Sequence, residues 1–121
     1  MNFTFDNDRP IYTQLAHQIK VLIVSGNIEP SEKLPSVREF ALKCKVNPNT
    51  MQKSLTSLEE EKLIFTERTN GKYVTNDTKL IEKIKKELAN EKVQIYLAEM
   101  ENLGFTKENA INYLHEEGGK N

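Results

Sequence analysis

The chain has 121 residues, of which 37% are hydrophobic, 29% charged and 7% aromatic. This length suits one domain with at most a small appendage, and it suffices to bury a core without disulfides or metals. The longest apolar run is Val21 to Val24, and residues 1–6 lack the basic start and apolar stretch of a signal peptide. We therefore expect a globular cytoplasmic protein without a membrane partner.

Cysteine and histidine are too few to form a disulfide framework or a zinc site. Cys44 is the single cysteine, and His17 and His115 are far apart in the sequence. Zinc sites need several such ligands at short spacings, and nucleophilic catalysis needs a nucleophile beside a base and an orienting group. We expect no metal and no cofactor, and an enzyme is the weakest functional class.

The net charge of −1, from 17 basic and 18 acidic residues, neither favours nor excludes nucleic acid. Its distribution is more informative. Lys43, Lys45 and Lys53 lie in a segment without acids, and Glu59–Glu61 follow within two helical turns. We expect this acidic run to be a solvated helix face at the end away from the basic segment.

The first half of the chain predicts three helices in a row. Residues 10–25 form the first, with Pro10 in its first turn and Gly26 as its stop. Its apolar face comprises Ile11, Leu15, Ile19, Leu22 and Ile23. Ser36 and Glu39 form a capping box for a short second helix that ends near residues 43–45. Its inward-facing residues are Val37, Phe40 and Ala41.

The third helix begins after Asn47, an N-cap residue, with Pro48 at its first position, and runs to about residue 62. Its apolar stripe comprises Met51, Leu55 and Leu58. Two β-prone runs follow, residues 63–69 and 72–75, on either side of Asn70-Gly71. This dipeptide is the strongest signal for a two-residue hairpin turn, so we expect a β-hairpin with Gly71 at its tip.

Helical periodicity returns from Thr78 to about Leu103, Gly104 interrupts it, and Thr106 is the expected N-cap of a last helix. The predicted fold class is mostly α with a small β-hairpin. It consists of a winged helix-turn-helix domain, residues 1–77, followed by a C-terminal helical dimerisation segment, residues 78–121.

Two short helices joined by a turn can place the N-terminus of the second helix in the DNA major groove. If the apolar stripe of the third helix faces inward, its outward residues are Asn49, Gln52, Lys53 and Thr56. Asn and Gln can pair with adenine, and Lys reaches guanine edges or phosphates. Arg38 and the free amides of the second helix suit phosphate, and Arg68 and Lys72 add charge to the wing.

The spaced motifs resemble one family. Pro10-Ile11-Tyr12 with Gln14-Leu15, then residues 34–41 (LPSVREFA), then residues 46–50 (VNPNT) with Leu55 and Leu58-Glu59 are similar to the N-terminal domain of GntR-family bacterial transcription regulators. The resemblance covers residues 10 to about 75. It implies a dimer on a pseudo-palindromic operator, with DNA contacts at Ser36, Arg38, Asn49, Thr50, Gln52, Lys53 and Gly71. We include Asn47, Arg68 and Lys72 among the expected DNA-binding residues.

The short tail is similar to that of the YtrA-like branch, whose C-terminal helices mainly dimerise. Its apolar stripe is wider than one surface helix needs, so it requires a partner surface, and a second copy is the simplest partner. The expected dimerisation residues are Leu80, Ile81, Ile84, Leu88, Tyr96, Leu97 and Met100. The alternative is that this stripe packs back on its own winged domain.

The leading hypothesis is a homodimeric, sequence-specific DNA-binding regulator, and specifically a repressor, since no segment resembles one dedicated to recruiting polymerase. The competing class is a winged-helix module for protein interactions, which predicts little affinity for duplex DNA even at low salt. The sequence identifies no operator, target gene or effector ligand.

Overall fold

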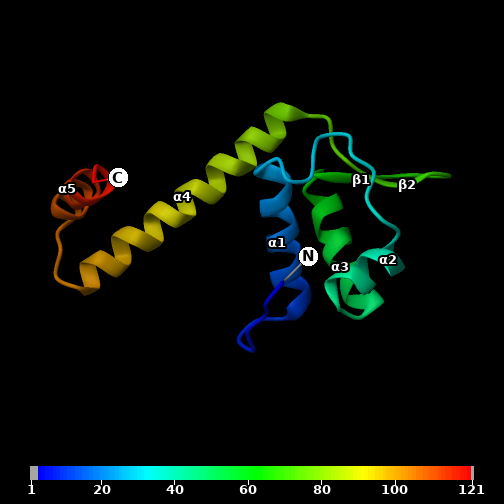
Figure 1. The fold of residues 1–121 in the computed structure, drawn as a ribbon, viewed down its shortest axis with the longest axis horizontal. Helices are drawn as coiled ribbons and strands as arrows, with labels where there is room; N and C mark the ends of the chain where they lie inside the picture. Colours follow the sequence, from blue (N-terminus) through cyan, green and yellow to red (C-terminus); the bar gives the residue numbers. More distant parts are fainter. Residues whose placement is uncertain (1–2, 121) are drawn as a thin grey trace. The chain divides into compact units, whose positions relative to one another are not determined.

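The computed structural model describes residues 3–120, and these contain five helices and one two-stranded sheet (Figure 1). The chain divides into two compact units, Met1–Lys85 and Lys86–Asn121. Each unit is described by itself below. No helix in the described part of the chain has both the length and the apolar character needed to cross a membrane.

Helix α1 (Ile11–Val24) begins after Pro10, which is the N-cap residue, and Gly26 follows its end with a φ of +86°. Leu15, Ile19 and Ile23 are buried as expected. Ile11 is 47% exposed, so its expected place on the buried face is wrong, and Leu22 is only half-buried. The buried stripe begins instead at Gln14, one turn into the helix.

Gln14 is 4% exposed and binds the segment that precedes α1. Its amide nitrogen donates to the carbonyl oxygens of Asp6 and Arg9 at 3.0 and 2.8 Å, and its Oε1 accepts from the Asp6 amide at 2.9 Å. A buried polar side chain is tolerated when its hydrogen bonds are made, as they are here. Gln14 therefore fixes the N-terminal segment to the start of α1.

Helix α2 (Val37–Cys44) and helix α3 (Pro48–Glu60) begin at the residues that the sequence predicts. Ser36 Oγ accepts from the Glu39 amide at 3.2 Å and donates to Glu39 Oε1 at 3.1 Å. Asn47 Oδ1 accepts from the Asn49 amide at 2.7 Å. Both predicted N-caps are confirmed, and each satisfies a backbone donor that the helix itself leaves free.

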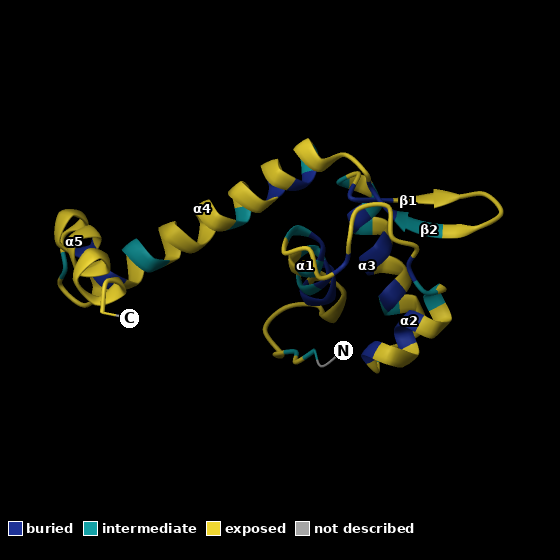
Figure 2. Cartoon of the chain, turned by 45° about the horizontal axis from the view of Figure 1, so that its top comes forward, coloured by how far each residue is buried: buried dark blue, intermediate teal, exposed yellow. Residues whose placement is uncertain are grey.

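The core of the first unit lies where α1 and α2 pack against α3, as the dark faces in Figure 2 indicate. Its fully buried side chains come from all three helices and from the hairpin: Leu15, Ile19, Phe40, Met51, Leu55, Leu58, Leu63, Ile64 and Val74. The predicted stripe of α3 is confirmed, because its three members have no exposed surface. Val37, expected to face inward, is half-buried.

Strands β1 (Ile64–Glu67) and β2 (Gly71–Val74) pair antiparallel, with Ile64 opposite Val74 and Glu67 opposite Gly71. The loop between them is residues 68–70, so the expected two-residue turn at Asn70-Gly71 is wrong. The Asn70 amide donates to the Glu67 carbonyl oxygen at 3.3 Å, and Gly71 follows with a φ of +103° as the first residue of β2. A turn followed by a glycine at positive φ is typical of three-residue hairpin loops.

Helix α4 (Thr78–Asn102) begins in the first unit, and α5 (Lys107–Gly118) lies wholly in the second. Gly104, with a φ of +97°, ends α4, and the Phe105 amide donates to the Met100 carbonyl oxygen at 3.0 Å. Thr106 Oγ1 accepts from the Asn109 amide at 3.1 Å. The predicted break at Gly104 and the predicted N-cap at Thr106 are confirmed.

Candidate nucleic-acid interface

The exposed face of α3 carries the polar residues that the sequence places there. Asn49, Gln52 and Lys53 are exposed, as is Thr56, whereas Thr50 is half-buried. Gln52 Nε2 donates to Thr56 Oγ1 at 3.2 Å. This bond lies along the surface of the helix, and it leaves the second amide hydrogen and the carbonyl oxygen of Gln52 for other partners. The predicted face is a row of hydrogen-bonding groups on a rigid helix.

The N-terminus of α2 lies beside the hairpin. A groove of about 380 Å³ runs between them, lined on one side by Ser36 and Val37 and on the other by Thr66, Gly71 and Lys72. Arg38 is exposed in the first turn of α2, and no acidic side chain among residues 3–120 pairs with it. Its charge is therefore available to an anion outside the chain.

The wing has two cations, of which one is paired and the other has no ion pair among residues 3–120. Arg68 is exposed in the loop between the strands. The Lys72 side chain is only 15% exposed, and its ammonium donates to Glu59 Oε1 and, at 2.8 Å, to Thr66 Oγ1. Thr66 Oγ1 in turn donates to Glu59 Oε1 at 2.8 Å. These three residues, the wing-base cluster, join β1 and β2 to α3.

The expectation that Glu59–Glu61 form a solvated face is wrong for two of its three members. Besides the contacts of Glu59, the Glu61 carboxylate accepts from Lys20 of α1 at 2.8 Å. Glu60 is exposed. Partial burial by itself raises the pKa of Glu59, but the hydrogen bonds from Lys72 and Thr66 and the charge of Lys72 lower it more, so that the net pKa lies below its ordinary value.

The basic segment also includes a cation held by an aromatic ring. Lys53 Nζ lies 5.4 Å from the centroid of the Tyr12 ring, within the range of a cation–π interaction.

Cys44 is the last residue of α2 and is 4% exposed. Burial raises the pKa of the Cys44 thiol, against a smaller lowering by nearby positive charge. The described residues contain no cluster suited to a metal ion.

The residues expected to mediate dimerisation fall into two groups. Ile81 and Ile84 belong to the first unit and are 9% and 6% exposed, so the single chain already covers most of their surface. Leu80, Leu88, Tyr96 and Leu97 are half-buried. Met100, in the second unit, is 9% exposed. Tyr96 Oη donates to the Ala110 carbonyl oxygen at 2.7 Å, which joins α4 to α5 within the second unit.

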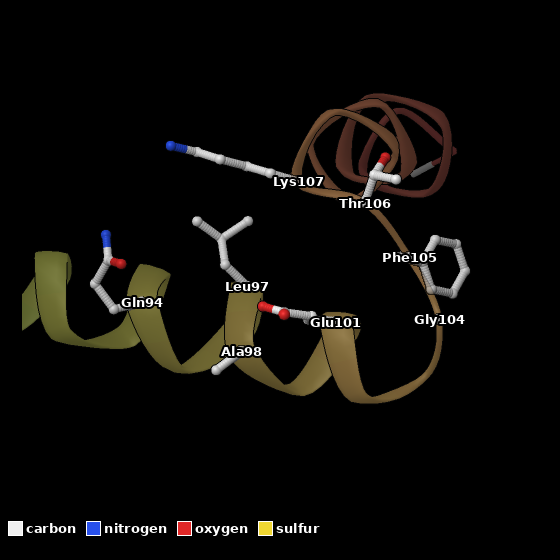
Figure 3. Close-up of a pocket in the computed structure, with 8 residues that line it drawn as sticks. All are labelled: Gln94, Leu97, Ala98, Glu101, Gly104, Phe105, Thr106 and Lys107. Carbon is white, nitrogen blue, oxygen red and sulfur yellow. The ribbon is translucent and has the colours of Figure 1, made fainter.

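The second unit leaves an apolar groove open between α4 and α5. The groove has a volume of about 470 Å³, and its apolar lining consists of Val93, Tyr96, Leu97, Ile111 and Leu114. A second hollow, of about 670 Å³, shares Gln94, Leu97 and Lys107 with it. Figure 3 shows Gln94 and Leu97 rising from α4 toward the side of Lys107, whereas Ala98 points away. Lys92 and Lys107 thus flank the largely apolar groove between α4 and α5.

Comparison with known sequences places these elements in a family. The family described as "Bacterial regulatory proteins, gntR family" matches residues 11–74, which run from the start of α1 to the end of β2. The chain belongs to the GntR family. The winged helix-turn-helix fold expected from the sequence is thereby confirmed, and the described structure supplies its three helices and its hairpin.

Relatives extend the GntR likeness beyond the matched domain. The helix-turn-helix transcriptional regulator YhcF of Bacillus subtilis is 35% identical over 111 residues, 92% of this chain and 92% of that protein. The transcriptional repressor YtrA of the same organism is 44% identical over 70 residues, 58% of this chain and 54% of that protein. The expected likeness to YtrA is confirmed. These relatives are transcriptional regulators and not enzymes.

A solved structure has the same organisation. A GntR-family transcriptional regulator from Listeria monocytogenes is 41% identical, with a TM-score of 0.84 over 93% of this chain and 98% of that one. The likeness therefore includes the two C-terminal helices. The chain is a DNA-binding transcriptional regulator of the GntR family.

Sequence reasoning missed several residues of this GntR surface. The sequence pattern shows Tyr12 only as part of the motif Pro10-Ile11-Tyr12, and Thr66 only as a member of a β-prone run. Ile111 and Leu114 lie in the last predicted helix, and the sequence analysis assigns them no role in a surface between helices. Ile111 and Leu114 are three residues apart, so they lie on the same side of α5. Ile111 directly follows the buried Ala110, and this offset is the sequence signal for a second apolar face on α5.

Proposed function

We propose that this GntR-family protein is a homodimeric repressor that binds a pseudo-palindromic operator. In each copy, α3 enters the major groove and the β1–β2 hairpin serves as the wing. The observation that carries this proposal is the exposed polar face of α3, where Asn49, Gln52 and Lys53 lie together on a helix whose opposite face is fully buried. A helix held so firmly can present its side chains to base edges in one register.

Sequence recognition is assigned to the first turns of α3. Asn49 and Gln52 can each offer an amide hydrogen and a carbonyl oxygen, which match the N7 and N6 positions of adenine. Asn47 and Thr50 flank them, and they suit backbone or sugar contacts near the entry of the helix. The Asn47 side chain accepts from the Asn49 amide, which fixes where this turn begins.

Phosphate anchoring is assigned to α2 and the wing. Arg38 is exposed and unpaired within residues 3–120, and Ser36 opens the helix whose N-terminal dipole favours an anion. Arg68 is exposed in the hairpin loop, and Gly71 lets the backbone approach closely. Lys72 is proposed to add charge at the base of the wing while it holds β2 to Glu59.

Dimerisation is assigned to the C-terminal segment, residues 78–121, and DNA binding to residues 1–77. The open groove of the second unit supports this division, because Val93 and Leu114 are each half exposed within a largely apolar surface. Surfaces of this kind mark sites of protein association. Leu80, Leu88, Tyr96 and Leu97 are the expected dimerisation residues that retain exposed surface, and Ile111 and Leu114 extend the list.

Repression and cytoplasmic location complete the proposal. The repressor role is supported by the name of the relative YtrA, a transcriptional repressor. The cytoplasm is where bacterial operator DNA lies.

The first experiment is selection of bound duplexes from a random DNA pool by the full chain, followed by titration of the winner against salt. A dimeric operator-binding protein should enrich an inverted repeat. The half-sites should be spaced by about one helical turn or more, and binding should weaken steeply with salt because phosphate contacts release counterions.

A scrambled duplex of equal length and composition is the control. Equal affinity for the repeat and the scrambled duplex would contradict sequence-specific binding. Weak binding that disappears at moderate salt would favour the protein-interaction module instead.

A further inference from the structure

The aromatic ring of Tyr12 lies against the recognition helix. Lys53 Nζ is 5.4 Å from its centroid, and Tyr12 is 37% exposed at the second position of α1. We propose that Tyr12 is a positioning residue for DNA binding. Its ring holds the Lys53 ammonium at the α1 edge of α3, where it binds a phosphate of the DNA backbone and does not read a base. This inference rests on the proposed function. It assigns Lys53 to phosphate binding, which is one of the two DNA contacts, guanine edge or phosphate, that a lysine can make.

The backbone of Tyr12 is fixed to α3 by a buried hydroxyl. Ser54 has no exposed surface, and its Oγ lies 2.8 Å from the Tyr12 carbonyl oxygen and 3.0 Å from that of Thr50. The residue that makes this contact directly follows Lys53 in the sequence. The Tyr12 ring therefore has a firm base, and Lys53 is the neighbouring side chain that it meets.

Helical geometry places Lys53 at one margin of the exposed face. At 100° per residue, Lys53 lies about 100° around the helix from Ser54, whereas Asn49 and Gln52 lie about 140° and 160° away. Lys53 is thus the exposed residue nearest to α1, and its ammonium leans farther that way onto the ring. A helix in the major groove has bases beneath its centre and a sugar-phosphate backbone along each side. The margin is where a phosphate lies.

The charge of Lys53 is free for this role, in contrast to two other lysines of the first unit. Lys20 pairs with Glu61 and Lys72 with Glu59, and the described acidic side chains leave Lys53 without an ion pair. An open groove of about 400 Å³ runs beside it, lined by Tyr12, Gln52, Lys53, Thr56, Ser57 and Glu60. A cation–π contact keeps the full positive charge while it restricts where the ammonium can go.

The test is a double-mutant cycle in the full chain, with Tyr12→Leu, Lys53→Met and the double variant. Affinity is measured over a range of salt for the selected operator and for a scrambled duplex. Lys53→Met should weaken both duplexes by the same factor and lower the salt slope by about one. Tyr12→Leu should weaken both about two- to fivefold, as expected for loss of an exposed cation–π contact, and should have no effect in the Lys53→Met background.

Two controls separate positioning from a structural role. Tyr12→Phe keeps the ring and should bind as the wild type does. Lys79→Met removes an exposed lysine from the first turn of α4, and Tyr12→Leu should keep its full effect in that background. The ε-methylene protons of Lys53 should also be shifted upfield by the ring in the NMR spectrum of the wild-type chain, which does not depend on the folding of any variant.

Several results would overturn the inference. An unchanged salt slope in Lys53→Met would contradict the phosphate contact. Weakening of the operator alone would contradict it too, and would assign Lys53 to base reading. Independent, additive effects of the two substitutions, or unshifted Lys53 protons, would show that Tyr12 does not act through Lys53. In all these cases the wild-type chain still binds its operator. A wild-type chain that binds no duplex at all would remove the proposed function and this inference together.

Discussion

The two units of the molecule treat their apolar side chains differently. In the first unit, Leu15, Phe40 and Leu55 have no exposed surface. Its exposed large apolar residues are spread over three elements: Ile11, Tyr12 and Val21 on α1, Leu42 on α2 and Phe65 on β1. In the second unit, exposed large apolar side chains lie on α4, on α5 and in the segment between them: Val93, Ile95, Leu103, Ile111, Tyr113 and Leu114. The first unit encloses a complete core, whereas the second unit leaves much of its apolar surface uncovered.

The polar groups show the same contrast. The first unit uses side chains to join its elements, as in the pairs Lys20–Glu61 and Lys72–Glu59 and the buried hydroxyl of Ser54. In the second unit, the side-chain hydrogen bond that joins α4 to α5 is that of Tyr96. A DNA-reading surface needs side chains in fixed positions, whereas an association surface needs apolar area that is free before the partner arrives.

The largest effect is expected where the second unit lacks a partner. Leu114 is 52% exposed, so a partner can bury about half of its side chain. Leu114→Glu therefore removes about 1 kcal/mol of apolar burial in each copy of a two-fold dimer, and it adds to each copy a charge that must be dehydrated. The mass measured by light scattering should fall from dimer to monomer, and operator affinity should fall with it. Leu42→Glu makes the same change at an exposed leucine of α2 and should leave the mass unchanged. A Leu114→Glu chain that stays dimeric would contradict the comparison.

The next effect is expected inside the complete core. Leu55→Ala should lower the free energy of unfolding by about 2–5 kcal/mol, because it leaves a cavity among fully buried neighbours. Urea unfolding followed by circular dichroism measures it. The same substitution at Leu114, which is 52% exposed, should cost less than about 1 kcal/mol at concentrations where the chain is monomeric. Equal losses at the two positions would show that both units are closed cores.

A smaller effect is expected at the surface of α2. Arg38→Ala should weaken operator binding by about 1–3 kcal/mol, because it removes an unpaired cation beside the helix N-terminus. Fluorescence anisotropy at constant salt gives the affinity, and Lys79→Ala serves as the control. Full-strength binding by the Arg38 variant would exclude it from the phosphate anchors.

The smallest effect concerns pH and the wing-base cluster. The fold lowers the pKa of Glu59, so its ionised form stabilises the folded state above the ordinary carboxyl pKa, and this contribution is lost as pH falls through the lowered value. Glu59→Gln should lower stability near neutral pH by at most about 1 kcal/mol, and should show a smaller further loss below about pH 5. Urea midpoints between neutral and acid pH measure it.

Glu60→Gln, a change at the exposed neighbour of Glu59, is the matched control and should leave the acid-induced loss as it is in the wild type. A Glu59→Gln chain that loses as much stability in acid as the wild type would show that the cluster contributes nothing through this carboxylate.

Local rules explain why most of the fold is readable in the sequence. Ser36, Asn47 and Thr106 each cap a helix within three residues of themselves, and Gly104 ends one through its own positive φ. The stripe Met51, Leu55 and Leu58 follows from helix periodicity. These signals depend only on residues that are close together in the chain, so they can be recognised in the sequence without the tertiary structure.

The candidate site was readable only in part. The outward direction of Gln52 and Lys53 follows from the same periodicity. The partners of Lys72, Lys20 and Lys53 lie 13, 41 and 41 residues away in the sequence, and no local pattern joins them. The length of the hairpin loop could not be predicted from the sequence, because Asn-Gly favours a two-residue turn. The pairing of Ile64 with Val74 in the core instead sets a strand register that leaves three residues in the loop.

The sequence by itself determined the helices, their ends, the apolar stripe of α3 and the family to which the chain belongs, since each depends on residues close together along the chain. Only the tertiary structure decided which charges are paired, which cation leans on Tyr12, and which apolar residues of α4 and α5 remain uncovered. Those outcomes depend on packing between distant segments, because a side chain is buried or paired only when another element arrives beside it.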